Sequence, residues 1–253
     1  MLIILVNNFR KDIIMDTIKI NKKNTLMVAH RGVSGLEKEN SMPAFIAAGN
    51  RSHYGVETDV HRTADGKFII LHDSDTKRVA GVACNVERTA YDVVRNIKLL
   101  DIDGTPGRCD LGIPSLEEYV RICKKYDKIC VLEIKTDLTE EETASMIDVF
   151  KANDYLDGVI FISFGFQNLL WVKKIDPSLP AQYLFGEYDE DLWDKLVENN
   201  IDIDVHHSQV TKEFMEKAHS LGLKVNCWTV DNPDRAHQLV DLGVDYITSN
   251  ILE

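Results

Sequence analysis

Residues 129 to 162 hold two short apolar runs, Ile129-Cys-Val-Leu-Glu-Ile134 and Val159-Ile-Phe-Ile162, on either side of a segment with the signature of a capped helix. Thr139 and Glu142 have the spacing of a capping box, in which each side chain accepts a hydrogen bond from the other residue's backbone N–H at the helix start. Two strand-length apolar runs around one helix predict a right-handed βαβ unit with parallel strands.

The same alternation continues along most of the chain. Ser41 before Pro43, and Ser115 with Glu118, mark two further helix starts. Nine apolar runs have the length and composition of strands. They are Leu26–Ala29, Gly55–Val60, Phe68–Leu71, Ile129–Ile134, Val159–Ile162, Gln182–Phe185, Ile201–Val205, Lys224–Val230 and Tyr246–Thr248. About eight strand–helix units predict an α/β fold of the closed (β/α)8 TIM-barrel type.

Nine candidate strands are one more than such a barrel holds, so one of them must lie outside the barrel or be no strand. The connection from Val60 to Lys67 is too short for a packed crossover helix, and Asp65-Gly66 could instead form a hairpin turn. Residues 74–112 lack periodicity and predict a small insertion after the third strand, at the mouth of the barrel. We therefore expect one barrel domain over residues 25–253, preceded by an added arm or extra strand over residues 1–24.

Composition and charge narrow the class of protein. The chain has 253 residues, of which 44% are hydrophobic and 28% are charged, as in ordinary globular proteins. Its net charge of −12 provides no field for docking on nucleic acid or on an anionic bilayer. Scattered cysteines without a C-x-x-C pair favour a reducing compartment, and the apolar start Met1–Val6 is too short to span a membrane. We expect a cytoplasmic protein without stable membrane insertion.

Three carboxylates lie on predicted strands that are otherwise apolar. Glu57 and Asp59 are two residues apart and therefore point to one side of the sheet, and Glu133 lies on the next long strand. Burying three like charges without compensation would raise their pKa values until some of them became neutral. One divalent cation removes this conflict, and ligation by oxygen alone suits Mg²⁺ or Ca²⁺. The alternative, that these residues are exposed on an antiparallel face, is less favoured beside the histidines and cations described next.

His30 and His72 are the only two of the eight histidines that close apolar strands. Two imidazoles, one accepting and one donating a proton, are suited to phosphoryl transfer near neutral pH. Arg31 and Lys135 would supply cations for a phosphate, Arg31 through its planar fork. Carboxyl ends of barrel strands form the active-site face of this fold, so we expect these side chains to converge there.

The remaining histidines are assigned no chemical role. His206 and His207 are adjacent and would face opposite sides of a strand, so we interpret them as structural or rim residues. The other four occur in polar, helical or loop contexts and are expected to be solvated: His53, His61, His219 and His237.

Eight short motifs follow one another in a fixed order. They are H-R-G at 30–32, E-N at 39–40, E-x-D at 57–59, T-x-D-G at 63–66, H-D at 72–73, E-I-K at 133–135, S-F at 163–164 and W-T-V at 228–230. In this order the chain resembles the glycerophosphodiester phosphodiesterase family, from about residue 26 to residue 249. The resemblance rests on the ordered set, because each motif alone occurs by chance.

The resemblance implies a (β/α)8 barrel and a metal-dependent hydrolase that releases glycerol 3-phosphate and an alcohol from glycerophosphodiesters. It implies that His30 and His72 are the acid and base. It implies that the metal is bound by Glu57, Asp59 and Glu133, and that the phosphate is bound by Arg31 and Lys135. It adds Trp228 as a wall of the glycerol or alcohol pocket. We expect a cyclic phosphate intermediate, because the 2-hydroxyl of glycerol neighbours the phosphodiester.

The chain also departs from the family pattern, and two rival functions stay open. Lys38 and Ser41 replace the proline and threonine of the usual P-E-N-T, and the usual I-T-D is replaced by Ile247-Thr248-Ser249-Asn250. One rival is a lysophospholipase D or another phospholipase of the same barrel superfamily, against which the net negative charge and the lack of an amphipathic surface segment count. The other is a catalytically inactive barrel that serves as a binding module. The sequence names neither the alcohol nor the cation.

Overall fold

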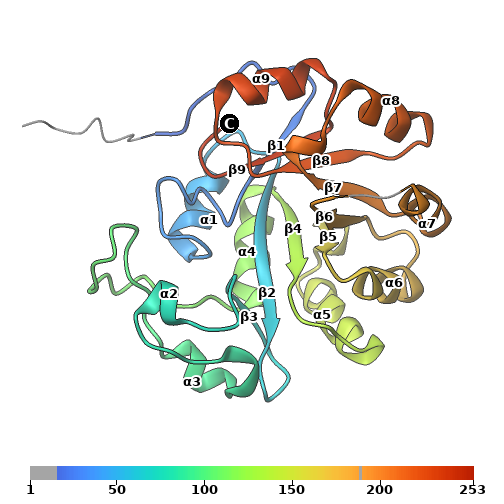
Figure 1. Cartoon of the computed structure of the whole chain (residues 1–253). Helices are drawn as coiled ribbons and strands as arrows, with labels where there is room; N and C mark the ends of the chain where they lie inside the picture. The colour runs from blue at the N-terminus through green and yellow to red at the C-terminus, as the bar shows by residue number, and fades with distance from the viewer. Residues whose placement is uncertain (1–15, 188–189) are drawn as a thin grey trace, which may run out of the picture.

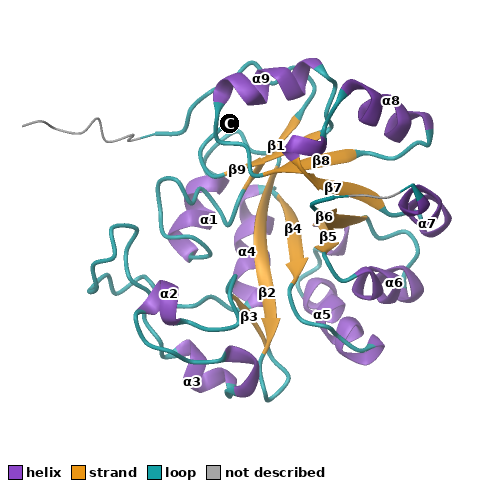
Figure 2. Ribbon diagram, in the orientation of Figure 1, coloured by secondary structure: helices purple, strands orange, loops and turns teal. Residues whose placement is uncertain are grey.

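The computed structural model describes residues 16–187 and 190–253. Its parallel strands close into a barrel, because β1 (Leu26–Ala29) pairs with both β2 (Gly55–Arg62) and β9 (Tyr246–Ser249). The other barrel strands are β4 (Ile129–Ile134), β5 (Val159–Ser163), β6 (Ala181–Phe185), β7 (Asp202–His206) and β8 (Val225–Trp228), paired in chain order. Figures 1 and 2 show these strands at the centre and the helices around them. The predicted (β/α)8 TIM barrel is confirmed.

The ninth strand lies outside the barrel. β3 (Phe68–Ile70) runs antiparallel to the end of β2, with Val60 opposite Ile70 and Arg62 opposite Phe68. The turn between them needs Gly66, whose φ of +81° lies in the left-handed region. The short link after β2 is therefore the hairpin that the sequence allowed.

Each barrel strand up to β8 leads through a helix of the outer ring to the next barrel strand, and the two short helices of the insertion after β3 are additional. The helices of the outer ring are α1 (Met42–Gly49), α4 (Leu116–Tyr126), α5 (Glu140–Ala152), α6 (Phe166–Ile175), α7 (Asp191–Asn199), α8 (Lys212–Ser220) and α9 (Pro233–Asp241). The two predicted capping boxes are present at the starts of α4 and α5, and the Ser41 hydroxyl caps α1. Across the described ranges, every helix is too short or too polar to span a bilayer.

Alternation along the strands divides the apolar side chains between two cores. On β2 and β4, residues such as Val56, Val60 and Leu132 point outward into the large core beneath the helices. The residues between them point inward, where a second cluster fills the barrel: Val28, Val131, Ile160, Ile162, Leu184 and Tyr246. Because this cluster fills the interior, the charged groups of the predicted site lie toward the carboxyl ends of the strands.

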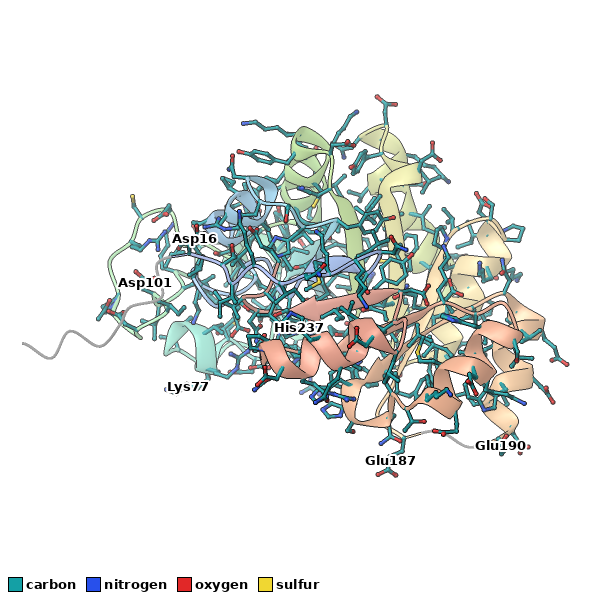
Figure 3. All side chains as sticks on the ribbon, turned by 90° about the horizontal axis from the view of Figure 1, so that it is seen from above. Asp16, Lys77, Asp101, Glu187, Glu190 and His237 are labelled. Carbon is teal, nitrogen blue, oxygen red and sulfur yellow. The ribbon has the colours of Figure 1, made fainter. Side chains whose placement is uncertain are left out.

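The predicted insertion after β3 is a compact unit. It contains α2 (Lys77–Ala80), the 3₁₀ turn η1 (Val86–Arg88) and α3 (Tyr91–Arg95). It has a core of its own, formed by Ile69, Leu71, Val79, Val86, Val94, Leu99, Leu111 and Ile113. In Figure 3, Lys77 and Asp101 of the insertion lie at one edge of the molecule and Glu187 and Glu190 at the opposite edge.

Residues 16–24 run along the last residues of the chain. The Ile18 N–H donates to the Ile251 carbonyl at 3.0 Å and the Ile20 N–H donates to the Glu253 carbonyl at 2.9 Å, in a short parallel pairing. Residues 1–15 of the expected arm lie outside the described ranges, so its assignment as an arm or extra strand stays a prediction.

Replacing Leu111 by alanine should lower the free energy of unfolding by about 2–5 kcal/mol, because it removes a fully buried side chain from the insertion's own core. Denaturant unfolding measures the loss. Val82, which is 55% exposed in the same insertion, provides the control, since V82A should change stability by less than about 0.5 kcal/mol. An L111A protein as stable as the wild type would show that the cluster contributes no packing energy.

Candidate active site

The predicted site residues gather around one cavity of about 200 Å³ at the carboxyl ends of the barrel strands. Its polar lining includes His30, Arg31, Glu57, His72, Glu133 and Lys135, and its apolar lining is formed by Ile162, Phe164, Leu184 and Trp228. Asp59 is fully buried beside two of these residues. The fold thus brings together side chains from strands β2, β4, β5, β6, β7 and β8 and from the turns after β1 and β3.

The three carboxylates form one cluster. Asp59 on β2 is the register partner of Glu133 on β4, and Glu57 precedes Asp59 by two positions on the same face. Each residue offers one oxygen to a set in which all the atoms lie within 4.8 Å of one another. All three side chains are buried, so water does not screen their charges.

The positive charges beside this cluster do not compensate all three carboxylates. Burial, together with the charges of Asp59 and Glu133, raises the pKa of Glu57 well above its usual range. Burial and the Asp59 charge raise the pKa of Glu133 to about 7. Only Asp59 has a lowered pKa, because Arg31 and Lys135 outweigh its burial. Among residues 16–187 and 190–253, the buried Asp59 Oδ1 atom has no hydrogen-bond partner, so the cluster fits a hard divalent cation that takes oxygen ligands.

Two cations border the cluster. The Arg31 Nε atom lies 3.5 Å from Asp59 Oδ2, and the Lys135 ammonium lies 2.7 Å from Glu133 Oε1 and 3.6 Å from Asp59 Oδ1. When ionised, the three carboxylates and these two cations leave one net negative charge. A divalent cation would turn this into one net positive charge, which matches the single negative charge of a phosphodiester.

The H-R-G turn after β1 requires an unusual backbone. Arg31 has a φ of +52° and Gly32 a φ of +76°, both in the left-handed region. A Cβ atom on Gly32 would lie 2.7 Å from the Ala44 backbone carbon, so the turn requires glycine there. The conformation directs the Arg31 N–H to Glu57 Oε2 at 2.8 Å, which fixes the carboxylate.

An amide group orients His30. Its Nδ1 atom lies 2.7 Å from Asn250 Oδ1, which also accepts a hydrogen bond from the Ser34 hydroxyl at 2.6 Å. The Asn250 Nδ2 atom donates to Asp231 at 2.5 Å, so Oδ1 must accept and His30 Nδ1 must carry the proton. The Nε2 atom, 3.9 Å from Glu57 Oε2, then has the free lone pair. Burial, followed by the Arg31 charge, lowers the pKa of His30.

A carboxylate orients His72. Its Nδ1 atom donates to Asp73 Oδ1 at 2.6 Å, and the other oxygen of Asp73 accepts from Arg78 Nε at 2.6 Å. Arg78 also binds Glu39, which in turn binds Arg31, so one network links both ends of the site. Burial lowers the pKa of His72, but the charge of Asp59 and the hydrogen bond to Asp73 act against this lowering.

Two histidines that were expected to be solvated are buried, so that expectation was wrong. His53 is 1% exposed and its Nε2 atom lies 3.0 Å from the Leu252 carbonyl. His61 is 3% exposed and lies between Glu87 and the His72 carbonyl, at 2.8 Å and 3.1 Å. His61 continues the inward positions of β2, and its spacing of two from Asp59 was the signal. His219 and His237 are exposed, as expected.

Other site residues were not assigned from the sequence. Asn40, from the E-N motif, donates to Asp59 Oδ2 at 2.7 Å and accepts from the Thr58 hydroxyl at 2.7 Å. Phe164, from the S-F motif, packs edge-on against Trp228 with ring centres 5.7 Å apart. His206 packs edge-on against the same ring at 5.3 Å. Asn40 thus orients the Asp59 carboxylate, and the aromatic residues build one wall of the cavity.

Comparisons with known proteins agree with one another. The profile of the glycerophosphoryl diester phosphodiesterase family matches residues 30–252. A protein of Caldanaerobacter subterraneus subsp. tengcongensis named glycerophosphodiester phosphodiesterase is 28% identical over 235 residues, covering 89% of this chain and 94% of that protein. A glycerophosphodiester phosphodiesterase structure from Parabacteroides distasonis has a TM-score of 0.76 and 27% identity, covering 90% of this chain and 93% of its own.

A second solved structure shares the fold at lower identity. The Oleispira antarctica phosphodiesterase OLEI02445, in complex with the product sn-glycerol-3-phosphate, has a TM-score of 0.83 and 23% identity, covering 92% of this chain and 96% of its own. At this identity the likeness concerns the barrel architecture. Together with the confirmed strand order, it shows that the chain has the same closed barrel.

Addition of Mg²⁺ or Ca²⁺ after treatment with a chelator should raise the unfolding temperature, because a bound cation compensates the buried carboxylates. At a cation concentration of about 100 times Kd, the expected increase in the free energy of unfolding is roughly 2.7 kcal/mol. Glu57→Gln should abolish most of this gain by removing a ligand oxygen. Without a cation the same variant should be at least as stable as the wild type, since it also removes a like charge. Thermal unfolding with and without each cation measures both effects.

Glu118→Gln provides the matched control, because Glu118 caps α4 and lies outside the cluster. This variant should lose stability and keep the full response to the cation. If the cation raised the unfolding temperature of Glu57→Gln as much as that of the wild type, the three carboxylates would not be the ligands.

Proposed function

This chain belongs to the glycerophosphoryl diester phosphodiesterase family, and we propose that it hydrolyses a glycerophosphodiester to glycerol 3-phosphate and an alcohol. The observation that carries the proposal is the cavity itself, where a buried carboxylate cluster, two cations and two differently oriented imidazoles meet. The names of the bacterial relatives support the same reaction.

We infer that Glu57, Asp59 and Glu133 hold one divalent cation, Mg²⁺ or Ca²⁺. When bound, such a cation stabilises negative charge on phosphoryl oxygens. Arg31 and Lys135 border the same carboxylates, so they would contact the phosphate from the neighbouring side. Trp228 would cover the carbon atoms of the glycerol.

The different partners of the imidazoles favour different roles. His30 has its free lone pair on Nε2, so we assign it as the base that takes the proton of the glycerol 2-hydroxyl. The resulting oxygen attacks phosphorus, and an attached nucleophile of this kind can gain effective molarities of ~10⁵ M. His72 has a carboxylate partner that stabilises its imidazolium, so we assign it as the acid that protonates the departing alcohol oxygen.

The second half of the reaction restores both residues. His72, now neutral, takes a proton from water as the water oxygen attacks the cyclic phosphate. His30 returns its proton to the 2-oxygen as the bond from that oxygen to phosphorus breaks. The product is glycerol 3-phosphate, and each imidazole ends in its starting protonation state.

Removal of the 2-hydroxyl from the substrate should stop the reaction. With a propane-1,3-diol phosphodiester that has the same leaving alcohol, we expect release of the alcohol to fall by at least ~10³-fold, because the internal nucleophile is lost. Chromatography of the released alcohol measures the rate, and competitive inhibition of the normal reaction shows that the analogue still binds. Undiminished turnover of the analogue would exclude the cyclic route.

The two limbs of the pH profile of kcat/KM should respond to different variants. Activity needs His30 without a proton and His72 with one, so the acidic limb follows the pKa of His30 and the alkaline limb that of His72. Asn250→Asp places a carboxylate against His30 and should raise its pKa, which moves the acidic limb to higher pH by roughly one pH unit. Asp73→Asn should lower the pKa of His72 and move the alkaline limb to lower pH by a similar amount.

Each of these two variants is the control for the other. Both exchange an amide and a carboxylate in the side chain that contacts a histidine Nδ1 atom, in opposite directions. Steady-state kinetics over a range of pH values measure the limbs. If Asn250→Asp moved the alkaline limb and Asp73→Asn moved the acidic limb, His30 would be the acid and His72 the base.

A further inference from the structure

Asp204 is a buried acid for which the proposed reaction has no use. It lies on β7, lines the catalytic cavity and is 1% exposed. Its Oδ1 atom has no hydrogen-bond partner in the described part of the chain. A buried polar group without a partner destabilises the folded state, so a valine or leucine at this position would make the barrel more stable.

The neighbouring polar side chains inside the barrel bind one another and leave Asp204 out. Asn226, its register partner on β8, donates to Gln182 at 3.2 Å and accepts from the Thr248 hydroxyl at 3.1 Å. Leu184, its register partner on β6, is apolar. Asp204 lines the cavity and none of these neighbours binds its carboxyl group, so this group can serve a molecule in the cavity.

Burial, more than the charge of Glu133, raises the pKa of Asp204 well above its usual range. A neutral carboxylic acid can donate one hydrogen bond and accept another, as an alcohol does. The rest of this part of the cavity is largely apolar, with Ile162, Leu184 and Trp228. Such a pocket, with one polar group among apolar walls, is suited to a small molecule that has a single hydroxyl at that end.

We propose that Asp204 binds the terminal hydroxyl of the substrate's glycerol unit and makes the cavity selective for glycerol phosphate over its deoxy analogue. This inference rests on the proposed function, in which the phosphate engages Arg31 and Lys135 and the 2-hydroxyl engages His30. The terminal hydroxyl is the polar group of the glycerol unit that then lacks a partner. The Asp204 carboxyl group, which lines the cavity, is its complement.

Binding of two phosphomonoesters tests the inference without requiring turnover. They are sn-glycerol 3-phosphate and the propane-1,2-diol 1-phosphate of matching configuration, which keeps the 2-hydroxyl and lacks the terminal one. By calorimetry in the presence of Mg²⁺, the wild type should bind the first at least ~10-fold more tightly. Asp204→Val should bring the ratio close to one, and Asp204→Asn, which keeps a donor and an acceptor, should retain most of it.

The unfolding temperature provides the readout that separates binding from folding. D204V should unfold at the same or a higher temperature than the wild type, because it removes an unpaired buried carboxyl. A lowered unfolding temperature in D204V would assign Asp204 to folding and overturn the inference, as would a wild-type ratio of one or an unchanged ratio in D204V. If the wild-type protein shows the expected ratio of affinities but does not hydrolyse glycerophosphodiesters, the proposed function is refuted. The assignment of Asp204 is then still supported.

Discussion

Mutual repulsion of three buried carboxylates is the constraint on which the rest of the site depends. Glu57, Asp59 and Glu133 share one inward face because β2 and β4 pair in register, and burial prevents water from screening them. Arg31 and Lys135 compensate part of the charge and Asn40 fixes one oxygen. A cation that completes the compensation would leave a positive site for a phosphodiester, so the repulsion among the carboxylates would also favour the cation that the proposed substrate needs.

The unequal surroundings of the imidazoles follow from the barrel's connectivity. His30 leaves β1 beside β9, where it meets the amide of Asn250. His72 follows the hairpin strand β3 outside the barrel, where Asp73 and the insertion's Arg78 support it. An amide stabilises a neutral ring and a carboxylate stabilises a charged one, so the fold gives the two rings the different surroundings that the proposed base and acid roles require.

The sequence predicted what depends on local spacing and failed where distant segments meet. Spacing by two correctly grouped Glu57 with Asp59, and capping residues marked the helix starts. His61 has the same spacing from Asp59 but was expected to be solvated, because its buried contact with Glu87 in the insertion cannot be placed from periodicity. The contact of Asn250 with His30 joins residues 220 positions apart, and the unpaired state of Asp204 depends on which neighbours bind each other. Such contacts require the closed barrel.

Because β1 pairs with β9, the site around His30 can form only after nearly the whole chain has been synthesised. His30 leaves the ribosome early, yet the amide that sets its tautomer is 220 positions further along the chain. A nascent barrel that lacks β9 has the histidine without its partner, and transient detachment of β9 in the finished protein would have the same effect. If His30 is the proposed base, the site becomes competent only when the barrel closes, and turnover can serve as an assay of barrel closure during refolding.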